Sequence, residues 1–122
     1  MKITVYNKEN INSDKHIMVD DEDLPLESDW EVSTATIKWL NSWKYKGFDN
    51  WRLPTIEELE ELFNNRGTIG GFNQDCYWSS SEIQKSKKYY EPRVWRLIFR
   101  DGCKSDTHKT AYWGTIRLVR NI

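Results

Sequence analysis

The segment that decides the fold spans residues 47–59 and reads Gly-Phe-Asp-Asn-Trp-Arg-Leu-Pro-Thr-Ile-Glu-Glu-Leu. Its second half has the pattern of a helix start. Thr55 and Glu58 match a capping box, in which each side chain accepts a hydrogen bond from the backbone N–H of the other residue. Pro54 lies just before the cap and restrains the approach of the chain. The pattern predicts a helix over Ile56–Asn64.

Regular patterns continue on both sides of this segment. Before it, residues 33–43 predict a second helix with Ser33 as its N-cap. Its expected packing face carries Thr36, Trp39, Leu40 and Trp43. Alternating or β-branched runs predict short strands, at residues 2–6, 16–19, 77–81, 94–100 and 116–121. The mixture indicates an α+β domain with an antiparallel sheet.

The strand at residues 94–100 is followed by a strong turn signal, Asp101-Gly102. Along this strand, hydrophobic side chains alternate with Arg96 and Arg100, so we expect the two arginines to face away from the core. Six large side chains are expected to be largely buried: Trp51, Trp78, Trp95, Leu97, Phe99 and Leu118.

The chain has 122 residues, of which 38% are hydrophobic and 30% charged, and this composition predicts one globular domain over residues 1–122. The first thirty residues do not resemble a signal peptide, and no apolar run is long enough to span a membrane. We therefore expect a cytoplasmic protein without membrane contacts. In that compartment Cys76 and Cys103 stay reduced, whereas export would allow them to pair.

Charge is distributed unevenly along the chain. Residues 1–31 carry a net charge of −6, residues 32–82 carry −2, and residues 83–122 carry +7. Such an asymmetry suggests a surface that faces a polyanion or a partner. It is equally compatible with two ends that lie side by side and neutralise each other.

Four blocks in this sequence, residues 47–59, 77–82, 95–102 and 116–120, resemble the C-terminal domain family of the Legionella collagen-like protein. The resemblance implies a C-type-lectin-like fold, with two helices flanking a small twisted antiparallel sheet. Some family members are secreted adhesins that bind sulfated polysaccharides. More distant relatives include formylglycine-generating oxidases and retroelement variable proteins. The matching positions, expected to have structural roles, are Trp51, Arg52, Pro54, Thr55, Glu58, Trp78, Trp95, Gly102, Arg117 and Arg120.

Catalytic and metal-binding patterns are weak. Cys103, Asp106 and His108 follow the predicted turn, but their spacing matches no zinc motif. The acidic run at residues 20–23 lacks the ligand spacing and glycine of a calcium loop, which favours a solvated loop. We therefore expect no metal, no cofactor and no enzymatic activity. Arg52 is expected to hydrogen-bond at the helix start, and Arg117 and Arg120 to pair with acidic residues.

The C-terminal third instead predicts a basic face with aromatic side chains, suited to a protein or an anionic polymer such as a sulfated glycan or a nucleic acid. Its candidate ligand-binding residues are Tyr89, Tyr90, Arg93, Arg96, Arg100, Lys104, Lys109, Tyr112 and Trp113. The predicted function is a non-catalytic binding module. A solvated basic surface, an oxidase-like enzyme and a variable display protein remain the alternatives.

Overall fold

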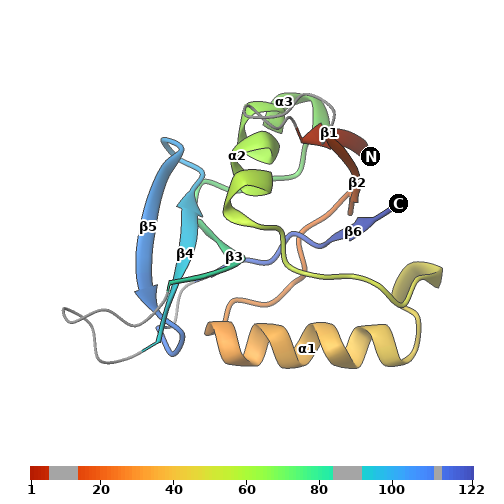
Figure 1. Ribbon diagram of the computed structural model, residues 1–122, viewed down its shortest axis with the longest axis horizontal. Helices are drawn as coiled ribbons and strands as arrows, with labels where there is room; N and C mark the ends of the chain where they lie inside the picture. The colour runs from red at the N-terminus through yellow and green to blue at the C-terminus, as the bar shows by residue number, and fades with distance from the viewer. Residues whose placement is uncertain (6–13, 84–91, 112–113) are drawn as a thin grey trace.

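A computed structural model describes residues 1–5, 14–83, 92–111 and 114–122. The predicted α+β class is confirmed (Figure 1). In chain order the elements are β1 (Lys2–Val5), β2 (Lys15–Val19), α1 (Trp30–Ser42), the 3-10 turn η2 (Tyr45–Gly47), α2 (Ile56–Asn64), α3 (Arg66–Ile69), β3 (Cys76–Ile83), β4 (Arg93–Ile98), β5 (Cys103–His108) and β6 (Val119–Asn121). Every helix in these ranges is too short or too polar to cross a membrane.

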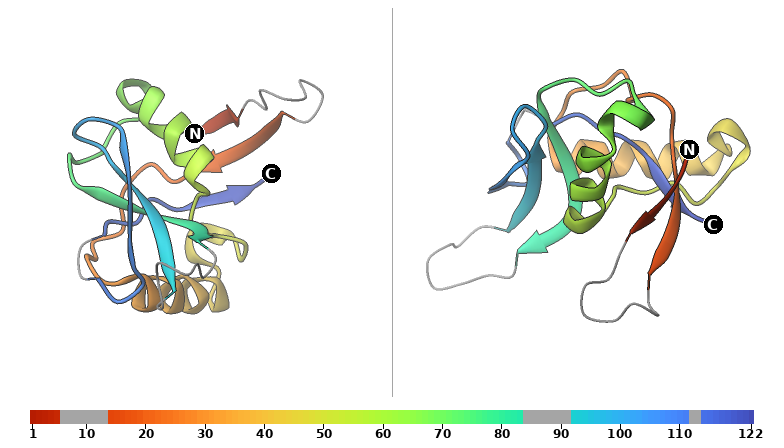
Figure 2. Two further views of the ribbon diagram at one scale, coloured as in Figure 1. Left: turned by 60° about the vertical axis from the view of Figure 1, so that its left-hand side comes forward. Right: turned by 90° about the horizontal axis from the view of Figure 1, so that it is seen from above.

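The strands form two antiparallel sheets, β1-β2-β6 and β3-β4-β5, where one sheet was expected (Figures 1 and 2). The difference arises in the predicted strand at residues 116–121. Only Val119–Asn121 pairs with β2. Residues 114–118 are an extended, fully buried connection, which leaves the β3-β4-β5 side of the molecule and reaches the second sheet. The same chain segment therefore contributes to both halves of the fold.

One hydrophobic core lies between α2 and the two sheets. It joins apolar side chains of β1 and β2 to Leu59 and Leu62 of α2 and to Tyr77 and Leu97 of the other sheet. Four of these residues, Leu59, Leu62, Tyr77 and Leu97, are fully buried. Helix α2 thus holds the two sheets together through this hydrophobic core, because burial of apolar surface is the main stabilising term in folding.

A second core lies between the β3-β4-β5 sheet and α1, which runs along the opposite side of the molecule (Figure 1). Trp78 of β3 and Val94 of β4 are fully buried here, against residues such as Ile37 of α1 and Leu118. The prediction of burial is confirmed for Trp51, Trp78, Leu97, Phe99 and Leu118. Trp95 is less buried than these five residues, because it packs at the margin of the first core, opposite Asp106 of edge strand β5.

Helix α1 begins one turn earlier than predicted. Its N-cap is Asp29, whose Oδ1 accepts a hydrogen bond from the backbone N–H of Val32 at 2.7 Å. Ser33, the predicted cap, is buried inside the first turn. The inward face consists of Ser33, Ile37 and Leu40, whereas Trp39 and Trp43 face solvent. Of the predicted packing face, Leu40 is buried as expected, but the prediction is wrong for Trp39 and Trp43 because the helix turns its Ser33 and Ile37 side to the core.

Two glycines allow close packing around the β3-β4-β5 sheet. Gly102 ends the β4–β5 turn at φ +80°, and its N–H donates to Ile98 O at 2.7 Å, which confirms the predicted hairpin. A Cβ atom there would also lie 2.6 Å from the Phe63 ring. At Gly114 a Cβ atom would lie 1.8 Å from Nε1 of Trp78. Any larger residue at position 114 displaces the buried indole.

The capping box of α2 is present as predicted, and it generates a stability prediction. Thr55 Oγ1 accepts from the N–H of Glu58 at 3.1 Å, and Glu58 Oε1 accepts from the N–H of Thr55 at 2.8 Å. Removing the hydroxyl in Thr55→Ala should lower the free energy of unfolding by about 1 kcal/mol. Thr55→Ser is the control, because serine keeps the acceptor. Urea unfolding measures both, and an alanine variant with an unchanged midpoint contradicts the role of the cap.

Candidate functional site

Residues 51–58 lead into α2 and connect it to three other elements, β6, α1 and β3. The backbone of Arg52 exchanges hydrogen bonds with Val119 of β6, at 2.8 and 3.1 Å. The Asn41 side chain of α1 both donates to Trp51 O and accepts from Trp51 N. Ser80 N–H donates to Pro54 O at 2.8 Å. This last contact falls in a bulge of β3, where its pairing with β4 is interrupted.

The charged centre of this segment is Glu58, whose side chain is fully buried. Arg52 binds it in a two-pronged ion pair, with Nη1 to Oε1 at 2.6 Å and Nη2 to Oε2 at 2.9 Å. Lys15 Nζ lies 3.0 Å from Oε2. Burial by itself raises the pKa of Glu58, but the hydrogen bonds from Arg52, the Thr55 N–H and Lys15 outweigh it and lower the pKa to about 2. The expected structural role of Arg52 is thereby confirmed.

Two cavities lie next to this ion pair, and Arg52 and Ser80 contribute to the walls of both. One has a volume of about 490 Å³, and its polar wall includes Lys15, Thr55 and Asn121. The other has a volume of about 340 Å³ and runs along α1. Its wall is mostly hydrophobic and includes Trp30, Ile37, Trp51 and Leu53. A cavity with a cationic wall and a cavity with an apolar wall therefore share Arg52 and Ser80.

The predicted basic face is divided between two sides of the β3-β4-β5 sheet. Directly paired residues of neighbouring strands point to the same side, and successive residues alternate. Lys104 pairs with Leu97 and so shares a side with Arg93, towards α2. Arg96 pairs with Ser105 on the other side, which also carries the fully buried Val94. The expectation that Arg96 faces away from the core is therefore wrong, because both faces of the sheet are covered.

Three of the predicted ligand-binding cations form ion pairs. Arg93 pairs with Asp106 at 3.1 Å, Lys104 with Glu60 at 3.2 Å, and Lys109 with Glu82 at 2.8 Å. Of these carboxylates, Glu60 and Glu82 come from outside residues 83–122, and each offsets one positive charge of that region. Arg100 is exposed and lines a cavity of about 280 Å³ beside Cys76. Four further candidates, Tyr89, Tyr90, Tyr112 and Trp113, lie outside the described residues.

The two arginines of the closing segment have different surroundings. Arg117 is fully buried, and its Nε donates to Asp23 Oδ1 at 2.8 Å, which confirms the expected acidic partner. It also donates to the carbonyl oxygens of Asp20 and Gly70. Arg120 instead lies 3.5 Å from the centre of the Phe48 ring, a cation–π contact. The N-terminal acidic region and the basic C-terminal region thus neutralise each other at least at Asp23.

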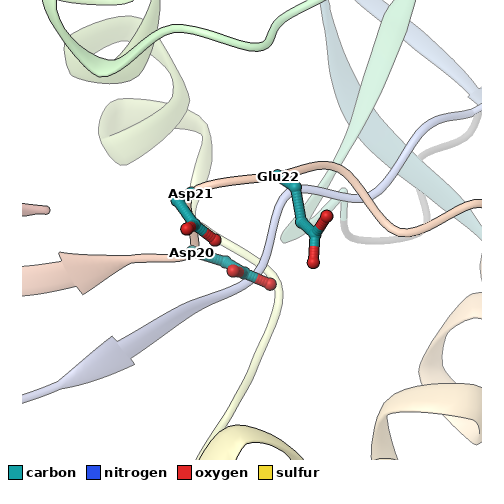
Figure 3. A group of neighbouring side chains, drawn as sticks. All are labelled: Asp20, Asp21 and Glu22. Carbon is teal, nitrogen blue, oxygen red and sulfur yellow. The ribbon is translucent and has the colours of Figure 1, made fainter.

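The acidic run after β2 brings the carboxylates of Asp20, Asp21 and Glu22 close together (Figure 3). Carboxylate oxygens of Asp20, Asp21 and Glu22 lie 2.6–2.9 Å from Nζ of Lys46. Their convergence explains why three carboxylates come close enough to resemble a cation site. Hydrogen bonds from Lys46 lower the pKa of Asp21 to about 2. Lys46 has φ +52°, an unfavourable backbone conformation for lysine, which these ion pairs stabilise. The acidic run therefore binds Lys46 of η2, and it is not the solvated loop that the sequence predicted.

An exposed aromatic surface was not predicted from the sequence. We call it the aromatic face, and it consists of Val32, Trp39, Trp43 and Phe48. Their exposed fractions are 47%, 62%, 50% and 41%. Trp39 and Trp43 meet edge to face with ring centres 5.5 Å apart. Contacts continue through Tyr45 to the buried Trp51. The helical spacing of Trp39 and Trp43 was visible in the sequence, but it was assigned to the core.

The two cysteines are held apart by a strand. Cys76 of β3 and Cys103 of β5 both pair with Ile98 of the intervening strand β4. Two strand spacings put their Cα atoms about 10 Å apart, beyond the reach of a disulfide. The Cys103 thiol hydrogen-bonds to Asp101, which raises the pKa of Cys103. Because residues alternate along β5, Cys103 also points away from the side that carries Asp106 and His108.

The buried Glu58 generates a prediction about pH. Its folded-state pKa of about 2 lies below the ordinary value of 4.5, so its contribution is complete above pH 4.5 and is lost as the pH falls towards 2. That pKa shift corresponds to a contribution of about 3 kcal/mol to the free energy of unfolding. The stability difference between wild type and Glu58→Gln should therefore shrink by about 3 kcal/mol between pH 6 and pH 2. Chemical unfolding across this range measures it.

The control for this experiment is the exposed neighbour in Glu57→Gln, which should show no comparable change. A difference between Glu58→Gln and wild type that stays constant with pH would mean that the Glu58 carboxylate is not stabilised in the folded state.

A search of curated proteins found no match. Comparison with protein families gave a match that includes nearly all of the features described above. The family model of the Lcl C-terminal domain matches residues 7–120. This range contains the capping box, the Arg52–Glu58 ion pair, both helical layers and the β4–β5 hairpin. The chain belongs to the Lcl C-terminal domain family.

Proposed function

We propose that this domain is a non-catalytic binding module that recognises a protein through the aromatic face. The observation that carries the proposal is the exposure of Trp39 and Trp43, whose rings are in contact, together with the exposure of Phe48, which packs on Trp51. Tryptophan is the residue most enriched among those that dominate protein-binding energy. Contiguous exposed apolar side chains also mark interaction sites more often than ordinary surface.

The aromatic face is well supported from beneath, which favours binding. Asp29 caps the first turn of α1, and the Asn41 side chain ties its last turn to Trp51. Tyr45 lies between the exposed Trp43 ring and the buried Trp51 ring, in edge-to-face contact with both. Rings held in this way lose little conformational freedom on binding, so more of the contact energy contributes to affinity.

Several features support a role without catalysis. An oxidase-like mechanism needs cooperating thiols, and here β4 separates Cys76 from Cys103. A raised thiol pKa at Cys103 also disfavours the reactive thiolate. The C-type-lectin-like fold and the cytoplasmic location, both expected from the sequence, remain part of this proposal. A variable display protein would use its surface for binding in the same way.

A polyanionic polymer, either a sulfated glycan or a nucleic acid, is the second candidate ligand. The observation that favours it is the net charge of +7 on residues 83–122, together with the exposed Arg100. Its binding would depend on Arg100 and on other cations of residues 83–122, and it would weaken steeply with salt because counterions are released. Binding through the aromatic face would depend far less on salt, since it buries apolar surface.

The two candidates predict opposite results for two double variants. The immobilised domain is incubated with lysate of its native cells at low and high salt. Trp39→Ser with Trp43→Ser should abolish capture of the partner, whereas Arg96→Glu with Arg100→Glu should leave it intact at both salt concentrations. Proteinase treatment of the lysate should remove the partner. Unfolding midpoints near that of the wild type show that both variants are folded.

The reverse pattern would contradict the proposal. Capture that survives the tryptophan changes, fails with the arginine changes and disappears in high salt would assign binding to a polyanion on the basic region. Heparin and single-stranded DNA, tested as pure ligands, then distinguish a sulfated glycan from a nucleic acid.

A further inference from the structure

We propose that the two cavities that share Arg52 and Ser80 in their walls are joined and form one site for an organic carboxylate with an apolar body. The carboxylate would lie in the cationic cavity, and the apolar body would lie in the cavity along α1. The site is distinct from the aromatic face. Residues 34, 37, 38 and 41 of α1 line the apolar cavity, whereas residues 32, 39 and 43 lie on another side of the helix.

Charge at the meeting point favours an anion. Lys15 and Arg52 supply two positive charges, and the Glu58 carboxylate forms ion pairs with both. The Glu58 side chain is 0% exposed, while those of Lys15 and Arg52 are 49% and 29% exposed. An approaching ligand therefore meets the two cations before it meets their counter-ion.

Neutral donors surround the same cavity. Thr55 Oγ1 accepts from Glu58 N–H, so the hydroxyl hydrogen of Thr55 can be donated to a ligand. Asn121 Oδ1 accepts from Arg52 Nη2 at 2.7 Å, which leaves the amide NH₂ of Asn121 as the group with donors to offer. The hydroxyl of Ser80 lies on an exposed residue of the bulge in β3. Convergent donors beside a cation are the chemistry that recognises a carboxylate.

The adjoining cavity matches the apolar part of such a ligand. Trp30, Ile37, Trp51 and Leu53 line it, and the last three are at most 6% exposed. Its volume of about 340 Å³ accommodates a phenyl ring or a branched alkyl group. Small-molecule sites are typically apolar cavities of this size with a few placed polar groups.

The polar groups are also held in position before a ligand arrives. Arg52 is fixed by its two hydrogen bonds to Glu58, and the Ser80 backbone is fixed by Pro54 O. Binding therefore requires little ordering of the arginine, and this saves the entropy that a flexible cation would lose.

The experiment titrates the folded domain with 4-phenylbutyrate, its neutral amide 4-phenylbutyramide, and acetate. Calorimetry gives the affinity, and amide NMR shifts give the location. We expect 4-phenylbutyrate to bind at least tenfold more tightly than the amide or acetate, with shifts at Leu53, Thr55 and Ser80. The peptide acid N-acetyl-Gly-Phe and its C-terminal amide form a second pair. Tighter binding of the peptide acid than of phenylbutyrate assigns the site to peptide C-termini, and the opposite order assigns it to free acids.

Two variants locate the interactions. Lys15→Gln should remove the preference for acid over amide, whereas Lys2→Gln, an exposed lysine of β1, should not change it. Thr34→Phe should fill the apolar cavity and weaken phenylbutyrate at least tenfold without deleting a core residue. Trp39→Ser with Trp43→Ser should leave phenylbutyrate binding unchanged, which separates this site from the proposed protein surface. Equal binding of acid and amide, or shifts confined to other regions, would overturn the proposal.

Discussion

The ion pair between Arg52 and Glu58 is the interaction on which the rest of this fold depends. A fully buried carboxylate is tolerated only when cations and hydrogen-bond donors compensate it, and Glu58 receives them from Arg52, Lys15 and the start of its own helix. These partners fix the approach of the chain to α2. The backbone of Arg52 then holds β6, and the neighbouring Trp51 holds the end of α1. One buried charge thus sets the relative positions of both helical layers and both sheets.

Both proposed surfaces follow from this arrangement. Trp51 supports the aromatic face from beneath through Tyr45, and it also lines the apolar cavity on another side of α1. Arg52 lines the cationic cavity while its fork is engaged by Glu58. The segment at residues 47–59 therefore does more than start helix α2. It places aromatic and cationic groups at the surface on a rigid support, and this is the property expected of a binding module.

Local chemistry in the sequence predicted the parts of the fold that depend on near neighbours. The capping box gave α2 with its observed bounds, and Asp101-Gly102 gave the β4–β5 hairpin. Features that depend on distant contacts were not predictable in the same way. Helical spacing on α1 suited two stripes equally, and only tertiary packing decides that Ile37 is buried and Trp39 exposed. The basic face failed as a single surface because strand pairing separates Lys104 from Arg96 and distant carboxylates pair with the lysines. The ion pairs of Lys46 with residues 20–22 likewise join segments that have no sequence relation.

A double-mutant cycle on Arg52 and Glu58 tests the central claim most directly. The free energy of unfolding is measured for wild type, Arg52→Met, Glu58→Gln and the double variant. If the ion pair organises the fold, each single change removes one partner of the pair, and the two effects should be strongly non-additive, with a coupling of about 2 kcal/mol or more. Additivity within about 0.5 kcal/mol would contradict the account, because it would mean that the two side chains stabilise the domain independently.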